Sequence, residues 1–135
     1  MISAMKISFM NPKSFYVPTG YTHVLSVETP GKILFISGQT SRNAKGDVIG
    51  LGDLEAQTTQ VYENLAFILK EMGASFDNVV QQTIYTTRVD EIDLIRKVRD
   101  KFIHKDRAPA STLVGVTGLA RKEFLIEVEM IAVLK

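Results

Sequence analysis

The sequence contains no cysteine, and histidine is scarce, with two residues in 135. Without cysteine the chain has no disulfides, no thiolate nucleophile and no cysteine-ligated zinc, which is typical of a cytoplasmic protein. His23 and His104 lie far apart and share no metal-ligand spacing with carboxylates. We therefore interpret both as surface or packing side chains, and we expect no metal site and no cofactor.

Neither sign of charge is in excess, because 16 basic residues face 15 acidic ones and the formal net charge is +1 at pH 7. A field this weak does not favour nucleic acid or an acidic membrane as a partner. No apolar run approaches the roughly 18 residues that a membrane helix needs. Met1–Lys6 lacks the basic and apolar regions of a signal peptide. A chain of this length predicts one domain, residues 1–135, with a buried core.

The C-terminal stretch is the most informative one, because it predicts two strands, Arg107–Val116 and Phe124–Leu134. Side chains alternate along a strand, so Glu127, Glu129 and Ile131 share one face of the second strand. We expect that face to meet a ligand, a partner subunit or water. The opposite face is apolar and fits a core: Ile126, Val128, Met130, Ala132 and Leu134.

Four further strands are predicted where β-branched and aromatic residues lie between Pro, Gly and polar turn residues. Lys32–Gln39 begins with a continuous apolar run, and we expect it to be buried on both faces. The polar loop Arg42–Gly50 follows it. The other predicted strands are Met5–Phe9 at a sheet edge, Tyr21–Val27 and Asn78–Val89.

Two amphipathic helices are predicted from apolar residues spaced three and four apart. Asp53 is placed to cap the first helix and Gly73 to end it in a left-handed conformation. Asp90 is placed to cap the second helix. The apolar stripes are Leu54, Val61, Leu65, Ile68 and Met72 in the first helix, and Ile92, Ile95, Val98 and Phe102 in the second.

The order of elements, β-β-α-β-α-β-β, predicts an α+β fold in which two helices lie on one face of a mixed sheet. The other sheet face is then uncovered in a single chain. A largely apolar open face implies that several copies assemble, and closed cyclic symmetry is the usual arrangement.

Two groups of charged residues have alternative interpretations. Glu127 is either a solvated or salt-bridged residue on an exposed face, or a general base that orients water in a cleft. Arg88, Arg96, Arg99 and Arg107 form either a solvated helix face or a groove for phosphate or nucleic acid.

Several segments together resemble the RidA (YjgF) family, also called endoribonuclease L-PSP. They are Gly20-Tyr21, Ile36–Gln39, Gln57-Thr58, Val61, Glu63–Leu65, Pro109-Ala110 and Leu125–Val133. The resemblance runs from about Gly20 to the C-terminus. It implies a chorismate-mutase-like α+β subunit, a homotrimer and ligand clefts between subunits. The best-known members hydrolyse reactive enamines and imines to 2-keto acids and ammonia.

The resemblance also implies roles for single residues. Glu127 matches the acid that orients the attacking water. Tyr21 matches a tyrosine near the pocket mouth, and Gly38 a glycine whose backbone N–H helps to hold the substrate carboxylate. Leu113 occupies a position whose main chain borders the site. The ligand that the resemblance implies is a small metabolite with a carboxylate.

One position departs from the family pattern. Deaminating members carry Pro-Ala-Arg-Ser, and their arginine corresponds to Ser111 in Pro109–Thr112. A serine offers one neutral donor, whereas the arginine pairs with the substrate carboxylate through two hydrogen bonds. Arg107 lies beyond a proline and is not expected to substitute. Arg96 is a candidate to turn into the cleft, and the alternative is a solvated helix position.

The sequence therefore resembles the family branches that lack this arginine, and three hypotheses remain. The first is an imine or enamine deaminase with an altered substrate. The second is a non-catalytic trimer that binds a small metabolite. The third is RNA binding or RNA cleavage, against which the near-neutral charge argues, since phosphate contacts need clustered Lys and Arg.

Overall fold

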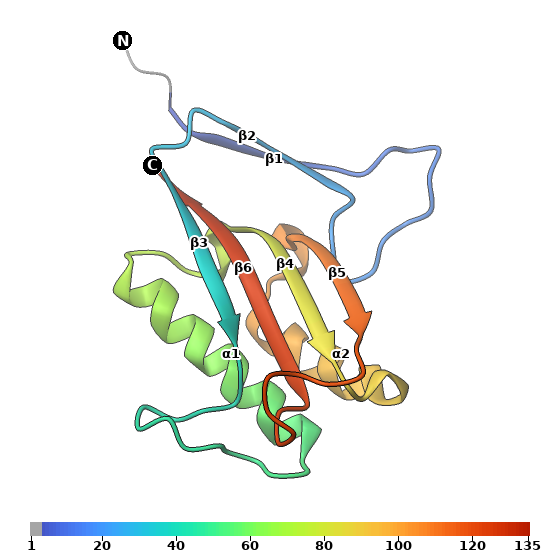
Figure 1. Cartoon of the computed structure of the whole chain (residues 1–135). Helices are drawn as coiled ribbons and strands as arrows, with labels where there is room; N and C mark the ends of the chain where they lie inside the picture. The colour runs from blue at the N-terminus through green and yellow to red at the C-terminus, as the bar shows by residue number, and fades with distance from the viewer. Residues whose placement is uncertain (1–3) are drawn as a thin grey trace.

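A computed structural model describes residues 4–135. A four-stranded mixed sheet carries two helices on one face, which confirms the predicted α+β architecture (Figure 1). The strand order is β3-β6-β4-β5, in which β6 is antiparallel to both neighbours and β4 is parallel to β5. The strands are β3 (Lys32–Gln39), β4 (Val79–Thr86), β5 (Ala110–Gly115) and β6 (Ile126–Leu134).

Three strands precede the first helix, and each lies in a segment predicted as a strand, although the element order β-β-α-β-α-β-β counted only two of them. The first two, β1 (Lys6–Met10) and β2 (Val24–Glu28), form a separate antiparallel ribbon (Figure 1). Thr29 has a positive φ of 52°, and Pro30 follows it without an amide proton. Strand β2 pairs with β1 and strand β3 pairs with β6, so β2 and β3 form no hairpin.

Helix α1 (Leu54–Glu71) begins where the sequence predicts it. The Asp53 side chain accepts a hydrogen bond from the Ala56 N–H at 3.0 Å. Gly73 has a φ of +75° at the C-terminal end, as predicted. Met72 was placed on the inner stripe but is 51% exposed, because the helix ends before it.

Helix α2 (Ile92–Phe102) begins differently from the prediction. Asp90 does not cap it, because residues Val89–Glu91 form a 3-10 turn and Glu91 takes the capping position without a side-chain hydrogen bond. The preceding strand is also shorter than predicted. The Arg88 N–H donates to Thr86 Oγ1 at 3.0 Å, which turns the chain away from the sheet at Thr86.

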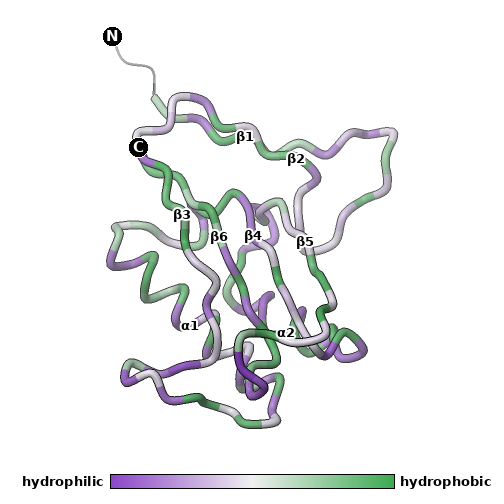
Figure 2. The backbone as a smooth tube through the Cα atoms, viewed as in Figure 1, coloured by the Kyte–Doolittle hydropathy of each residue, from purple (hydrophilic) through white to green (hydrophobic). Residues whose placement is uncertain are grey.

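The core lies between the helices and the sheet. The apolar face of β6 is buried there as predicted, with Ile126, Val128 and Ala132 fully inaccessible to solvent. The Tyr62 hydroxyl lies within the core and donates to Gln82 Oε1 at 2.9 Å, and burial raises the pKa of Tyr62. Figure 2 shows hydrophobic residues along the strands and hydrophilic residues in the loops before α1 and β6.

The sheet face opposite the helices is open. Burial of β3 on both faces is a wrong prediction for a single chain, because Ile33 is 48% exposed and Phe35 is 77% exposed. The reason is that both helices lie on the other side of the sheet, so no second layer covers the outer face of β3 (Figure 1). Phe35 pairs with Ile131, so it shares the open face with Glu127 and Glu129.

Residues 4–135 include no helix that combines the length and the apolar character needed to cross a membrane.

Candidate functional site

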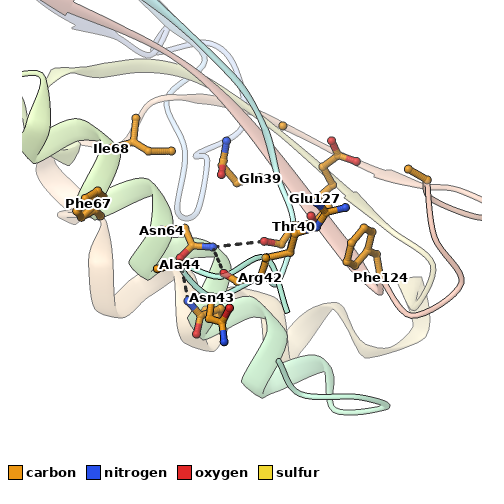
Figure 3. Close-up of a pocket in the computed structure, with 14 residues that line it drawn as sticks. Gln39, Thr40, Arg42, Asn43, Ala44, Asn64, Phe67, Ile68, Phe124 and Glu127 are labelled. Carbon is orange, nitrogen blue, oxygen red and sulfur yellow. Dashed lines mark hydrogen bonds between the residues drawn. The ribbon is translucent and has the colours of Figure 1, made fainter. Parts of the chain in front are cut away.

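A cavity of about 800 Å³ lies where the end of β3, the following loop, helix α1 and the start of β6 meet (Figure 3). Strand β3 contributes Gly38 and strand β6 contributes Glu127. Among the described residues that line it, only Arg42 and Glu127 carry a charge. The rest are amide, small and apolar side chains, which suits a small polar ligand.

Gly38 and Glu127 form a close contact between neighbouring strands. A Cβ atom placed on Gly38 would overlap Oε2 of Glu127 and lie 2.7 Å from its Cδ. The φ of Gly38 is not positive, so the glycine is required here for space and not for backbone conformation. The Glu127 carboxylate therefore lies directly over the β3 backbone, half-buried and facing the cavity.

The Glu127 carboxylate is free of partners in the described part of the chain, where no hydrogen bond or ion pair to it is found. Glu129, two residues along the same face, differs. Its Oε1 accepts a 2.8 Å hydrogen bond from the Tyr85 hydroxyl, and this bond is the main cause that raises the pKa of Tyr85. Of the two acids, Glu127 is the one whose carboxylate has no hydrogen bond or ion pair within residues 4–135.

Gly38→Ala is expected to move this carboxylate while the fold persists. The new methyl group overlaps the end of the flexible Glu127 side chain, which can move aside, so we expect the free energy of unfolding to fall by less than about 1 kcal/mol. We expect the rate of the reaction proposed below to fall about 100-fold, as displacements near 1 Å in an active site do. Activity, melting temperature and a crystal structure of the variant test this.

The matched control is Gly118→Ala, because a Cβ atom there meets nothing within 4 Å and the φ of Gly118 is not positive. That variant should keep both activity and melting temperature. Full activity in Gly38→Ala would contradict the assigned role of the contact.

The loop after β3 is fixed to helix α1 by one asparagine (Figure 3). Asn64 Nδ2 donates to the Arg42 carbonyl at 2.8 Å and to the Thr40 carbonyl at 3.4 Å. Its Oδ1 accepts from Gln60 Nε2 at 2.8 Å. Arg42 and Gln60 were not predicted as site residues, and the only sequence signal was the polar pair Gln60 and Asn64, four apart on a helix.

Tyr21 and Arg96 lie elsewhere in the chain. Both line a second cavity of about 790 Å³ between the loop after β1 and helix α2. The Tyr21 hydroxyl donates to the Tyr16 hydroxyl at 2.9 Å, and this hydrogen bond is the main cause that raises the pKa of Tyr21. Arg96 is exposed and forms a 3.5 Å ion pair with Asp93. Within one chain these two predicted residues do not meet Glu127.

Ser111 and Leu113 also lie apart from the Glu127 cavity. In the β4–β5 register Ser111 pairs with Gln82 and Leu113 with Ile84. Paired residues share a sheet face, and Gln82 and Ile84 are buried under the helices. Ser111 and Leu113 therefore point toward the helix side, whereas Glu127 points to the opposite side of the sheet.

Arg107 and the two histidines contact nearby residues and do not line the Glu127 cavity. Arg107 donates from Nη2 to the Asp77 carbonyl at 3.2 Å, and its guanidinium lies 5.1 Å from the centre of the Phe9 ring. His104 Nδ1 lies 3.2 Å from Asp77 Oδ1 at the surface, and His23 Nε2 lies 2.9 Å from the Tyr16 carbonyl. Residues 4–135 contain no cluster of three or more His, Asp or Glu side chains placed to hold a metal ion.

Comparison with known proteins covers most of the chain. The family model described as Endoribonuclease L-PSP matches residues 13–134. A protein named putative regulator AldR from Lactococcus lactis is 38% identical over 104 residues, covering 76% of this chain and 80% of that protein. A protein named 3-aminoacrylate deaminase RutC from Acinetobacter baylyi is 30% identical over 125 residues, covering 90% of this chain and 98% of that protein.

Solved structures share the fold. The Yersinia pestis protein YyfB, described as a member of the conserved Rid protein family of unknown function, superimposes with a TM-score of 0.85 at 34% identity. The match covers 95% of this chain and 98% of that chain. A putative endoribonuclease from Thermotoga maritima gives a TM-score of 0.71 at 33% identity, over 85% of this chain and 87% of that chain. This chain therefore belongs to the endoribonuclease L-PSP family, which is the RidA (YjgF) family.

Proposed function

We propose that the protein hydrolyses a small reactive imine or enamine, with Glu127 as the acid that orients and deprotonates the attacking water. The carrying observation is the unpaired, half-buried Glu127 carboxylate that faces a cavity of about 800 Å³ over Gly38. A carboxylate in such a place can hold a water molecule against a bound ligand. The relative named 3-aminoacrylate deaminase supports this class of reaction.

For a 2-imino acid the reaction adds water across C=N and then breaks the C–N bond. The substrate enters with its imine nitrogen protonated; the water oxygen attacks the iminium carbon while Glu127 accepts one water proton, which gives a neutral carbinolamine. Glu127 then donates this proton to the amino nitrogen. The C–N bond breaks with its electron pair leaving on ammonia, the hydroxyl proton passes back to Glu127 as the 2-keto acid forms, and Glu127 releases that proton to ammonia or solvent. No electron is gained or lost, so we propose no cofactor.

We further propose a homotrimer in which each Glu127 cavity is completed by a neighbouring copy. In one chain the family's site positions fall into separate places: Gly38 with Glu127, Tyr21 in the second cavity, and Ser111 on β5. Such half-sites are what an intersubunit cleft requires. The open sheet face carries the exposed apolar side chains of Ile33 and Phe35 together with Glu127 and Glu129, and assembly would cover the two apolar side chains.

A coupled assay tests the activity. A dehydratase generates 2-iminobutanoate, and the release of ammonia and 2-oxobutanoate is followed with and without this protein. The wild-type protein is expected to hydrolyse 2-iminobutanoate faster than the uncatalysed reaction. Ser111→Arg is expected to accelerate hydrolysis further, about 10-fold or more, because the proposed trimer would bring position 111 of a neighbouring copy to the shared cleft, where a guanidinium offers a charge-assisted contact to the carboxylate.

Ser111→Gln is the matched control, since it adds length and hydrogen-bond donors without charge. If only Ser111→Arg accelerates hydrolysis, the natural substrate is not a simple 2-imino acid. If neither protein does, the deaminase proposal fails for this substrate class.

Ser111 itself favours a second candidate, a trimer that binds a small metabolite without turnover. It predicts that a ligand raises the melting temperature while no product forms. Nucleic-acid cleavage is less favoured, since the net charge is +1. The lack of cysteine supports a cytoplasmic location, which cell fractionation tests.

A further inference from the structure

Arg42 is the basic member of the cavity that contains Glu127. Its guanidinium carbon lies 5.1 Å from the centre of the Phe124 ring, and Phe124 is buried. A cation held over an aromatic face is attracted to it and loses part of its freedom. Figure 3 shows Arg42, Phe124 and Glu127 together on one side of the cavity.

The charge of Arg42 is available to a ligand. Four other arginines have carboxylate partners, at 2.9 Å for Arg88, 3.5 Å for Arg96, 3.0 Å for Arg99 and 3.9 Å for Arg107. Arg121 has none among the described residues, but it does not line the cavity. Within residues 4–135 Arg42 has no such partner, and it forms no ion pair with Glu127. A planar guanidinium without a partner, in a concave site, matches the two oxygens of a carboxylate.

The backbone that carries Arg42 is fixed. Its carbonyl accepts the 2.8 Å hydrogen bond from Asn64 of α1, and its N–H donates to the Thr40 carbonyl at 2.8 Å. Arg42 also forms an antiparallel bridge with Val48 across the loop. The guanidinium therefore extends from an anchored position, which reduces the entropy lost when a ligand binds.

We infer that Arg42 binds the carboxylate of the ligand in the Glu127 cavity, in place of the arginine that deaminating relatives carry at the position of Ser111. Ser111 has no charge with which to bind a carboxylate, and within one chain it lies apart from the Glu127 cavity, whereas Arg42 lines that cavity. A 2-imino acid held at its carboxylate by Arg42 presents its C=N carbon toward Glu127. The substrate class rests on the function proposed above, but carboxylate binding by Arg42 does not require turnover.

Binding measurements test this inference without catalysis. Isothermal titration calorimetry compares 2-oxobutanoate with its uncharged analogue 2-oxobutanamide, on wild type, Arg42→Gln and Arg42→Lys. Arg42→Gln is expected to raise the dissociation constant of 2-oxobutanoate roughly 10- to 100-fold, which is the range for the loss of a hydrogen bond to a charged group. The affinity for 2-oxobutanamide should change less than about 2-fold. Arg42→Lys should keep part of the affinity for 2-oxobutanoate, because the lysine ammonium still supplies a positive charge.

Arg121 supplies a matched control. Its guanidinium carbon lies 5.9 Å from the centre of the same Phe124 ring, but Arg121 does not line the cavity. Arg121→Gln therefore removes the same charge beside the same ring and should leave both affinities unchanged. Equal weakening of both ligands in Arg42→Gln overturns the inference, as does unchanged 2-oxobutanoate binding or a wild type that binds neither ligand.

The outcome is separable from that of the proposed function. If 2-oxobutanoate binding depends on Arg42 but the coupled assay shows no ammonia release, Arg42 is confirmed as the carboxylate-binding residue and the proposed deaminase activity is wrong. If the Arg42→Gln variant releases ammonia as fast as wild type, the proposed deaminase activity stands and the role of Arg42 is wrong.

Discussion

Glu127→Gln is expected to slow imine hydrolysis by about 100- to 10 000-fold, the usual contribution of a positioned general base. Glutamine keeps the length and shape of the side chain over Gly38 but cannot accept the water proton. The carboxylate has no partner within residues 4–135, so the change leaves no other group unpaired and stability should be kept. The coupled assay measures the rate, and thermal unfolding measures the stability.

Glu129→Gln is the control for this prediction. Glu129 lies on the same face of β6 but is bound by the Tyr85 hydroxyl and does not line the cavity. Its replacement removes an equal charge two residues away, and activity should stay within about 3-fold of wild type. If the Glu127→Gln variant hydrolyses the imine as fast as wild type, a group other than Glu127 is the general base.

Phe35→Asp is expected to convert the assembly into single chains. Phe35 is 77% exposed on the open sheet face of one chain, and the proposed trimer would bury it. An unpaired carboxylate moved into an apolar interface costs several kcal/mol for each copy. Light scattering after size exclusion should change from three times the 15.0 kDa of one chain to 15.0 kDa, and activity should be lost with the shared cleft.

Leu51→Asp is the matched control, since Leu51 is 70% exposed in the loop before α1 and away from the open sheet face. It should assemble as wild type does. A wild type with the mass of one chain would end the trimer proposal, and an assembled Phe35→Asp variant would place the interface elsewhere.

The parts of the fold that depend on neighbours in sequence could be predicted. Alternation along β6 identifies its buried face, and Asp53 and Gly73 mark the ends of α1 through hydrogen bonds within a few residues. The open sheet face was predicted, but the exposure of Phe35 was not, because a continuous apolar run does not show which of its side chains face away from the helices. The separation of the β1–β2 ribbon was also not predicted, because it depends on how distant segments pair.

The candidate site divides in the same way. Gly38 and Glu127 meet because β3 and β6 are adjacent strands, and the family resemblance already named both. Arg42 lies in a loop without periodicity, so no sequence pattern distinguishes it from other surface arginines. Its place beside Phe124 became visible only with the tertiary structure.

The contact between Gly38 and Glu127 also limits how the protein can evolve. Because the acid occupies the volume that a side chain at position 38 would need, position 38 cannot gain a side chain while the acid keeps its place, whereas position 127 can change while Gly38 stays. A lineage that acquires a side chain at position 38 must shorten, redirect or abandon the acid at position 127. Covariation of the two positions among descendants would then mark the branches in which the ancestral chemistry has been given up.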